Sequence, residues 1–214
     1  MRTLTLAFLL LLALPPGARA GDAARNAAGD FDYYVLAISW VPAWCAREGD
    51  DRDAPNCAEG AGVGWGVHGL WPQHDDGTWP EFCPTPHRNP SRAQTGAQAD
   101  LFGSGGSAWH QWNKHGRCSG LSAPDYYALT AQARDLFDLP ALDTLPRIGT
   151  DTLRKTLLAA NPTLAADHFV LTCRQGALDE LRLCLTPDLT PHPCDARLAA
   201  RACDRRTLRL PPPR

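Results

Sequence analysis

The chain has 214 residues and a nearly balanced charge, with 21 basic and 23 acidic side chains and a formal net charge of −2. This length suits one domain with a substantial core. The charge argues against a protein that coats nucleic acid non-specifically, because such proteins depend on many phosphate contacts, but an enzyme needs only a local positive site.

Residues 1–20 have the pattern of a secretory signal peptide. Arg2 precedes an apolar run, and the small-residue sequence at 18–20 predicts cleavage after Ala20. The run is too short to span a bilayer, and no second run follows. We therefore expect residues 21–214 to form one exported domain, periplasmic or extracellular, with no membrane attachment after cleavage.

Three stretches in the first half of the chain have contrasting patterns. Tyr33–Trp40 is rich in β-branched and aromatic residues and stops before Pro42, which predicts a buried strand. Asp50–Glu59 is polar and predicts a loop. Gly60–Gly69 contains five glycines, so we expect an irregular strand and loop. More loop is expected across Pro72–Pro90.

The sequence Val67-His68-Gly69-Leu70-Trp71-Pro72 is the first candidate site segment. The glycines on either side of His68 let the backbone approach a ligand closely. Trp71 offers a ring on which a flat group can stack. His68 and Trp71 are therefore candidate site residues.

A second candidate segment lies on a helix predicted over residues 109–115. Residues four apart share a helical face, so His110 stacks over Lys114 and Gln111 stacks over His115. One helical surface therefore holds two imidazoles, one amine and one amide. Together with His68, these groups could supply a general acid and a general base.

Two other interpretations of this helix remain open. Trp112 could pack in the core while the polar residues merely solvate an outer face. A zinc protease site would need histidines four apart with a glutamate between them, whereas His110 and His115 are five apart and residue 111 is glutamine. A metal centre is therefore not expected.

The next two elements are predicted helices. Ser122 and Pro124 have the pattern of a helix start, and Thr150 is a candidate cap for the following helix, which Asn161-Pro162 ends. The residues expected to face inward are Tyr127, Leu136 and Phe137 on the first helix, and Leu153, Leu157 and Leu158 on the second.

A β-hairpin is predicted near the end of the chain. His168–Cys173 and Leu178–Leu185 bracket a Gln175-Gly176 turn, and three leucines in the second strand alternate with Arg182 and Cys184. This alternation predicts one buried face. Strands at both ends with helices between them indicate an α+β fold with a largely antiparallel sheet.

Eight cysteines lie in the part of the chain predicted to be exported. An even number in an oxidising compartment predicts four disulfides, although the sequence alone allows many pairings. The spacings lack the paired Cys-x-x-Cys knuckles of structural zinc sites.

The two candidate segments together resemble the two active-site segments of the T2-type ribonuclease family, secreted enzymes that cut RNA without a metal. Tyr33–Cys45 also resembles the first strand of that family, with its Trp40, Pro42 and Cys45. The resemblance covers most of the chain after residue 20 but not the tail after Cys203. It implies an α+β fold, an RNA substrate, no cofactor and no obligate protein partner.

The resemblance also implies a disulfide pairing and a set of residue roles. His115 would be the base, His68 the acid, and Lys114 the group that stabilises charge on the phosphoryl oxygens. His110 and Trp71 would help to hold the substrate, and the first product would be a 2′,3′-cyclic phosphate. The implied disulfides are Cys45–Cys57, Cys83–Cys118, Cys173–Cys203 and Cys184–Cys194.

Gln111 departs from this resemblance, because the family pattern has glutamate there. An amide can donate a hydrogen bond to phosphate, but it cannot raise the pKa of nearby histidines through charge. Losing a charge-assisted hydrogen bond costs roughly 1.5–3 kcal/mol, or about ten- to a hundredfold in rate. We therefore expect an enzyme that is slower but active.

Two other functions remain as alternatives to the enzyme. One is a non-catalytic protein that binds RNA or another polyanion, and the other is a disulfide-rich structural domain.

Overall fold

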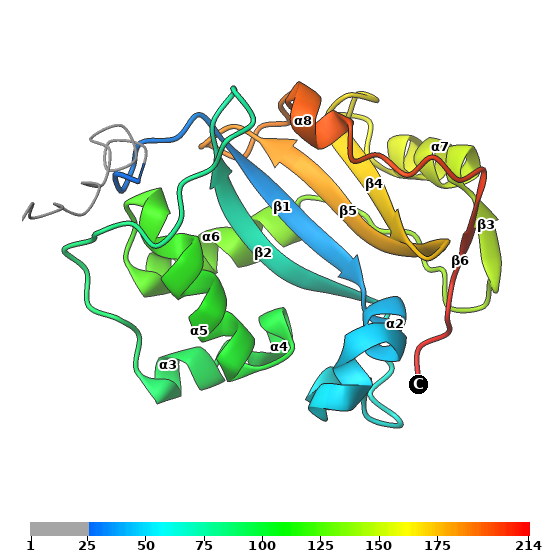
Figure 1. The fold of residues 1–214 in the computed structure, drawn as a ribbon, viewed down its shortest axis with the longest axis horizontal. Helices are drawn as coiled ribbons and strands as arrows, with labels where there is room; N and C mark the ends of the chain where they lie inside the picture. Colours follow the sequence, from blue (N-terminus) through cyan, green and yellow to red (C-terminus); the bar gives the residue numbers. More distant parts are fainter. Residues whose placement is uncertain (1–25) are drawn as a thin grey trace, which may run out of the picture.

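A sheet of six strands runs through the structure (Figure 1). The computed structural model describes residues 26–214, so the predicted signal peptide at residues 1–20 lies outside the described residues. The strand order is β2-β1-β5-β6-β3, with β4 beside β5, and every pairing except β5 with β6 is antiparallel. The predicted α+β class is confirmed. The strands are β1 (Tyr33–Trp40), β2 (Trp65–Gln73), β3 (Arg147–Gly149), β4 (Phe169–Arg174), β5 (Ala177–Leu185) and β6 (Thr207–Arg209).

Helices α3–α5 lie beyond the β2 edge of the sheet, and α8 lies near the end of β5 (Figure 1). Ser104 and Ser122 cap α5 and α6, because each side chain accepts a hydrogen bond from a backbone N–H in the first turn. The helices are α2 (Val41–Trp44), α3 (Arg92–Gly96), α4 (Ala99–Phe102), α5 (Gly105–Lys114), α6 (Ala123–Asp135), α7 (Thr150–Ala160) and α8 (Ala196–Ala199). Shorter helical turns are η1 (Cys45–Gly49), η2 (Asp50–Arg52), η3 (Pro55–Cys57) and η4 (Gly116–Ser119).

The two faces of the sheet have different surroundings. Along β1, alternate side chains point to opposite faces. One set, Tyr34, Leu36, Ile38 and Trp40, packs in the main hydrophobic core. The other set begins with Tyr33 and Val35, which pack in a smaller cluster with Val170, Cys184 and Leu198. This second face includes α8 and, as described below, the polar residues of the candidate site.

Two expected boundaries on the segments of the site were wrong. Residues 60–69 form a loop followed by an irregular strand, as expected, but this strand, β2, continues from Trp65 to Gln73, two residues into the loop expected from Pro72. Its pairing with β1 overrides the low strand propensity of its glycines. The helix expected from residue 109 begins earlier, at Gly105, because Ser104 caps it.

Three finer expectations were also corrected. Leu136 is 49% exposed because it follows the last residue of α6 and points into solvent. Thr150 is the first residue of α7 rather than its cap, and its hydroxyl donates to the carbonyl of Arg205. The hairpin formed as expected, but Cys184 on its supposedly open face is fully buried.

The four disulfides join the pairs that the resemblance implied: Cys45–Cys57, Cys83–Cys118, Cys173–Cys203 and Cys184–Cys194. The second connects η4, directly after α5, to the loop after β2. The last two fasten the segment that contains α8 to β4 and β5. Among the described residues, none of the helices has the length and apolar character needed to span a membrane.

Candidate active site

His68 lies at an irregularity of β2 that turns its side chain out of the sheet. The register pairs Ala37 with Gly69 and Ile38 with Val67, which leaves His68 as the extra residue of a β-bulge. Bulges often re-aim a side chain beside a functional site. His68 is exposed although its neighbours Val67 and Gly69 are buried.

Helix α5 presents the second candidate segment with two of its residues buried toward β2. Trp112 is fully buried in the main core, which fixes the rotation of the helix. Gln111 and His115 are 3% and 7% exposed, while His110 is exposed and Lys114 is partly exposed. Trp112 therefore packs in the core, while the polar residues of the same helix are partly buried toward β2 rather than all solvating an outer face.

The approach of α5 to β2 depends on the absence of a side chain at Gly69. A Cβ atom there would overlap the Gln111 carboxamide and the indole nitrogen of Trp71. In the space that remains, Trp71 Nε1 donates a 2.9 Å hydrogen bond to Gln111 Oε1. Gln111 therefore joins the helix to the strand, which is a role that the sequence did not indicate.

His115 is held neutral by its surroundings. Burial, reinforced by the positive charges of Lys114, His68 and His110, lowers the pKa of His115 to about 3. Its ring packs 5.4 Å from the Trp71 ring, and its Nδ1 is buried without a hydrogen-bond partner among residues 26–214. Burial followed by the charges of Lys114 and His68 also lowers the pKa of His110.

His68 has a different environment, because a carboxylate binds it. Its Nδ1 lies 2.6 Å from Glu180 Oε1, and the other oxygen of Glu180 accepts hydrogen bonds from Arg182 Nε and Nη2 at 2.8 and 2.7 Å. Burial opposes ionisation of Glu180, but the hydrogen bonds and charges of His68 and Arg182 outweigh it and lower the pKa of Glu180 to about 2. The small Ala37 and Ser39 on β1 leave room for this contact between β5 and β2.

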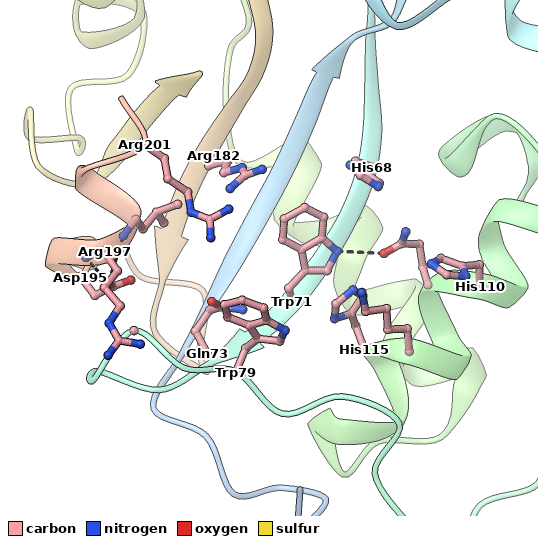
Figure 2. Close-up of a pocket in the computed structure, with 14 residues that line it drawn as sticks. His68, Trp71, Gln73, Trp79, His110, His115, Arg182, Asp195, Arg197 and Arg201 are labelled. Atoms are coloured by element: carbon pink, nitrogen blue, oxygen red, sulfur yellow. Dashed lines mark hydrogen bonds between the residues drawn. The ribbon is translucent and has the colours of Figure 1, made fainter. Parts of the chain in front are cut away.

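The side chains of both candidate segments and of Arg182 line one cavity with a volume of about 410 Å³. Figure 2 shows Trp71 between His110 and His115 on one side and Arg182 and Arg201 on the other. Lys114 reaches the cavity and also contacts Glu81, with 3.3 Å between Nζ and the carboxylate. A second cavity of about 950 Å³ shares His68, His110, Gln111 and Arg182 with the first, so these four residues lie where the cavities meet.

Comparison with known proteins identifies this arrangement. The model of the Ribonuclease T2 family matches residues 31–194, which is most of the chain. The chain belongs to the Ribonuclease T2 family. Among curated relatives, a ribonuclease of Aeromonas hydrophila is 39% identical over 126 residues, which cover 59% of this chain and 55% of the relative. The extracellular ribonuclease LE of Solanum lycopersicum is 31% identical over 52% of each chain. The chain thus spans about half the length of the curated relatives it matches.

Solved structures share the T2 fold over nearly their whole length. An RNase-related protein from Calystegia sepium superposes with a TM-score of 0.67 at 18% identity, covering 85% of this chain and 97% of the other. RNase NT in complex with 5′-AMP also gives a TM-score of 0.67, at 19% identity, covering 86% of this chain and 99% of the other.

Within this T2 fold, the structure brings together all six predicted site residues, His68, Trp71, His110, Gln111, Lys114 and His115. Trp40 is buried in the core and Trp44 lines the second cavity. Among the described residues, one group could hold a metal ion by spacing, namely Cys173, Cys203 and Asp204, but its two cysteines form a disulfide.

The sequence interpretation missed Glu180, which lines the second cavity, and several residues that line the first cavity of this T2 fold. Glu180 was not singled out, and Arg182 was treated only as an outward-facing strand residue. The available signal was that Glu180 and Arg182 occupy alternate positions of one strand, which places both on one face. Trp79, Arg197 and Arg201 were also missed, because Trp79 and Arg201 lie outside helices and strands and the four-residue α8, which contains Arg197, is too short to show a periodic pattern.

Proposed function

We propose that this protein is an exported endoribonuclease that cleaves single-stranded RNA by transphosphorylation. The observation that supports this most directly is the pair of imidazoles, His68 and His115, which line one cavity in opposite electrostatic environments. His115 is buried beside cationic groups and remains neutral, whereas Nδ1 of His68 lies 2.6 Å from the Glu180 carboxylate. Groups with opposed environments in one pocket are suited to be a base and an acid.

The reaction begins with the 2′-hydroxyl of the ribose next to the scissile phosphate. His115 takes the proton from this hydroxyl, its oxygen forms a bond to phosphorus, and the bond from phosphorus to the 5′-oxygen breaks. His68 gives its proton to the departing 5′-oxygen. The products are a 2′,3′-cyclic phosphate and a 5′-hydroxyl, and proton exchange with water restores both histidines.

The remaining site residues have supporting roles in this proposal. Lys114 stabilises the charge that develops on the phosphoryl oxygens. His110, where the two cavities meet, contacts the phosphate, and Trp71 provides a stacking surface for a base. The predicted signal peptide supports export, and family membership supports RNA as the substrate.

The direct test is cleavage of RNA by the purified protein, residues 21–214, in the presence of a chelator. We expect fragments with 2′,3′-cyclic phosphate ends, detected by mass spectrometry, at a rate that the chelator does not change. His115→Ala is expected to abolish cleavage. No cleavage by the unaltered protein would refute the enzymatic proposal, and full activity in His115→Ala would refute the assignment of the base.

The competing function is a non-catalytic protein that holds RNA or another polyanion on the same fold. Gln111, in place of the glutamate of the family pattern, favours this alternative. The contact between Lys114 and Glu81 also favours it, because Glu81 partly neutralises the charge of the lysine. RNA binding without cleavage would support this alternative.

A further inference from the structure

We propose a second phosphate subsite on Arg197 of α8 and on Arg201, just after this helix, which binds the phosphate on the 5′ side of the nucleoside whose 3′-phosphate is cleaved. This inference rests on the proposed function and adds a substrate preference to it. The enzyme would favour RNA segments with phosphates on both sides of the bound nucleoside over substrates with the scissile phosphate alone.

The first observation is an excess of positive charge in the first cavity. Its wall contains four permanently cationic side chains and one carboxylate, Asp195, although the whole chain has a net charge of −2. Two of the cations, Lys114 and Arg182, have carboxylate partners in Glu81 and Glu180, and the other two are Arg197 and Arg201. Such a local concentration in an otherwise acidic protein focuses the field on an anionic ligand. A single scissile phosphate, bound beside Lys114 and the histidines, leaves Arg197 and Arg201 without an anionic ligand.

The second observation is that the charges of Arg197 and Arg201 are available. Among residues 26–214, Arg182 is paired with Glu180, whereas neither Arg197 nor Arg201 forms an ion pair. Asp195, although it lies in the same wall, forms an ion pair with neither arginine in this part of the chain. One of its oxygens accepts the Tyr33 hydroxyl hydrogen bond, and the other accepts from the backbone N–H groups of Arg197 and Leu198.

The third observation is that the fold holds this segment in place. Disulfides at Cys194 and Cys203 fasten both of its ends to the sheet, and Leu198 packs in the hydrophobic cluster beneath it. The side-chain stem of Arg197 packs on Gly77, where an added Cβ would lie 2.6 Å from Arg197 Cδ. A fixed scaffold with unpaired guanidinium groups is suited to recognise phosphate.

The direction of the RNA follows from the order of the groups in the cavity. In Figure 2, Trp71 and Trp79 lie between the arginines and His115. A nucleoside stacked on these rings has its 3′-phosphate toward the histidines and its 5′-phosphate toward Arg197 and Arg201. The match to the family model ends at residue 194, so both arginines belong to a part of the chain outside that match.

Binding measurements test the subsite without requiring catalysis. By calorimetry, the unaltered protein is expected to bind adenosine 3′,5′-bisphosphate about tenfold more tightly than adenosine 3′-monophosphate. The double variant Arg197→Ala/Arg201→Ala is expected to reduce this ratio to about twofold or less. Arg205→Ala, which removes an exposed arginine paired with Asp204 outside the cavity, is the matched control and should keep the full ratio.

Kinetics then connect the subsite to cleavage. The ratio of kcat/KM for a dinucleotide with a 5′-phosphate to that for the same dinucleotide without it should be about tenfold, and the double variant should lower it. Equal affinities for the two nucleotides in the unaltered protein would overturn the subsite. A failure to cleave either dinucleotide would count against the proposed function, and the binding ratio would still report on the subsite.

A separate observation supports a second inference, that Glu180 is a positioning residue for His68. An ionised carboxylate only accepts hydrogen bonds, so the 2.6 Å contact requires Nδ1 of His68 to donate. This contact fixes the orientation of the ring and directs Nε2 away from Glu180. Arg182 and the hydroxyl of Ser39 hold the carboxylate in turn. Glu180, on β5, thus supplies a carboxylate to the site. Helix α5 supplies none, because residue 111 is glutamine.

The leaving group distinguishes this role from a structural one. RNA releases a 5′-alkoxide that needs a proton from the acid, whereas a nucleoside 3′-(p-nitrophenyl phosphate) releases an anion that is stable without one. Glu180→Gln is expected to lower kcat for RNA at least tenfold more than kcat for the aryl substrate. Equal losses on both substrates, as a folding defect would produce, or no loss on RNA, would overturn the inference. Cleavage of neither substrate by the unaltered protein would instead count against the proposed function.

Discussion

At the scale of single residues, the weak point of the site is the low basicity of His115. Its neighbours Lys114, His68 and His110 are all cationic or can become so, and α5 has no carboxylate to oppose them. A base with a pKa of about 3 remains deprotonated throughout the physiological range but accepts a proton weakly. The residue at position 111 is buried against the same strand and can change this balance by its charge.

Gln111→Glu is therefore expected to raise turnover. A carboxylate can still accept the hydrogen bond from Trp71, and its charge raises the pKa of His115 toward the working pH. We expect about a tenfold increase in kcat at pH 7 and an acid limb of the pH–rate profile that moves to higher pH. Gln111→Leu is the control, because it has a similar size but no charge. An equal gain in Gln111→Leu, or no shift of the acid limb in Gln111→Glu, would contradict the electrostatic explanation.

The sequence was informative about this site where residues are close along the chain. The spacing on α5 predicted which side chains share a face, and the resemblance supplied His68 and the disulfide pairs. It was not informative about Glu180, because the contact of Glu180 with His68 joins residues 112 positions apart across an intervening strand. Such a contact depends on the strand order and register, and neither follows from periodicity.

At the scale of elements, the site depends on how closely α5 lies against β2. The bulge at His68 and the missing side chain at Gly69 are both needed, and the sequence indicated only that the glycines permit a close approach. It could not indicate where β2 begins and ends, since pairing with β1 compensates for the poor strand propensity of its glycines. Tertiary contacts decided the structure of this segment.

Gly69→Ala tests this packing. The added methyl group would overlap Gln111 and Trp71, so helix and strand must separate or the hydrogen bond between them must break. We expect a loss of about 1–3 kcal/mol in stability and at least a tenfold loss in kcat. Gly106→Ala is the matched control within α5, because the nearest atom to its added Cβ is 3.7 Å away and alanine favours helix. Similar losses in both variants would show that the approach of α5 to β2 does not limit activity.

At the scale of the whole molecule, the site reduces stability in acid while the disulfides and the core oppose unfolding. In the folded protein His115 has a pKa of about 3, but an unfolded histidine titrates near ~6.5. Between these two values the unfolded chain binds a proton that the native state excludes. The contribution of His115 to stability is therefore complete above about pH 6.5 and falls as the pH decreases toward 3. Glu180, with its lowered pKa of about 2, adds a loss in the same direction at lower pH.

Thermal unfolding at two pH values can measure how much stability is lost through the titration of His115. Between pH 7 and pH 4.5 the titration of His115 is expected to remove about 2–3 kcal/mol of stability, or roughly 5–10 °C in Tm. His115→Asn removes the titrating group while keeping a polar side chain, so its Tm should fall by several degrees less over the same pH interval. His87→Asn, at an exposed histidine outside both cavities, should behave like the unaltered protein. If the Tm of His115→Asn falls as far as that of the unaltered protein, His115 is not the buried neutral base and another group is responsible for the acid sensitivity.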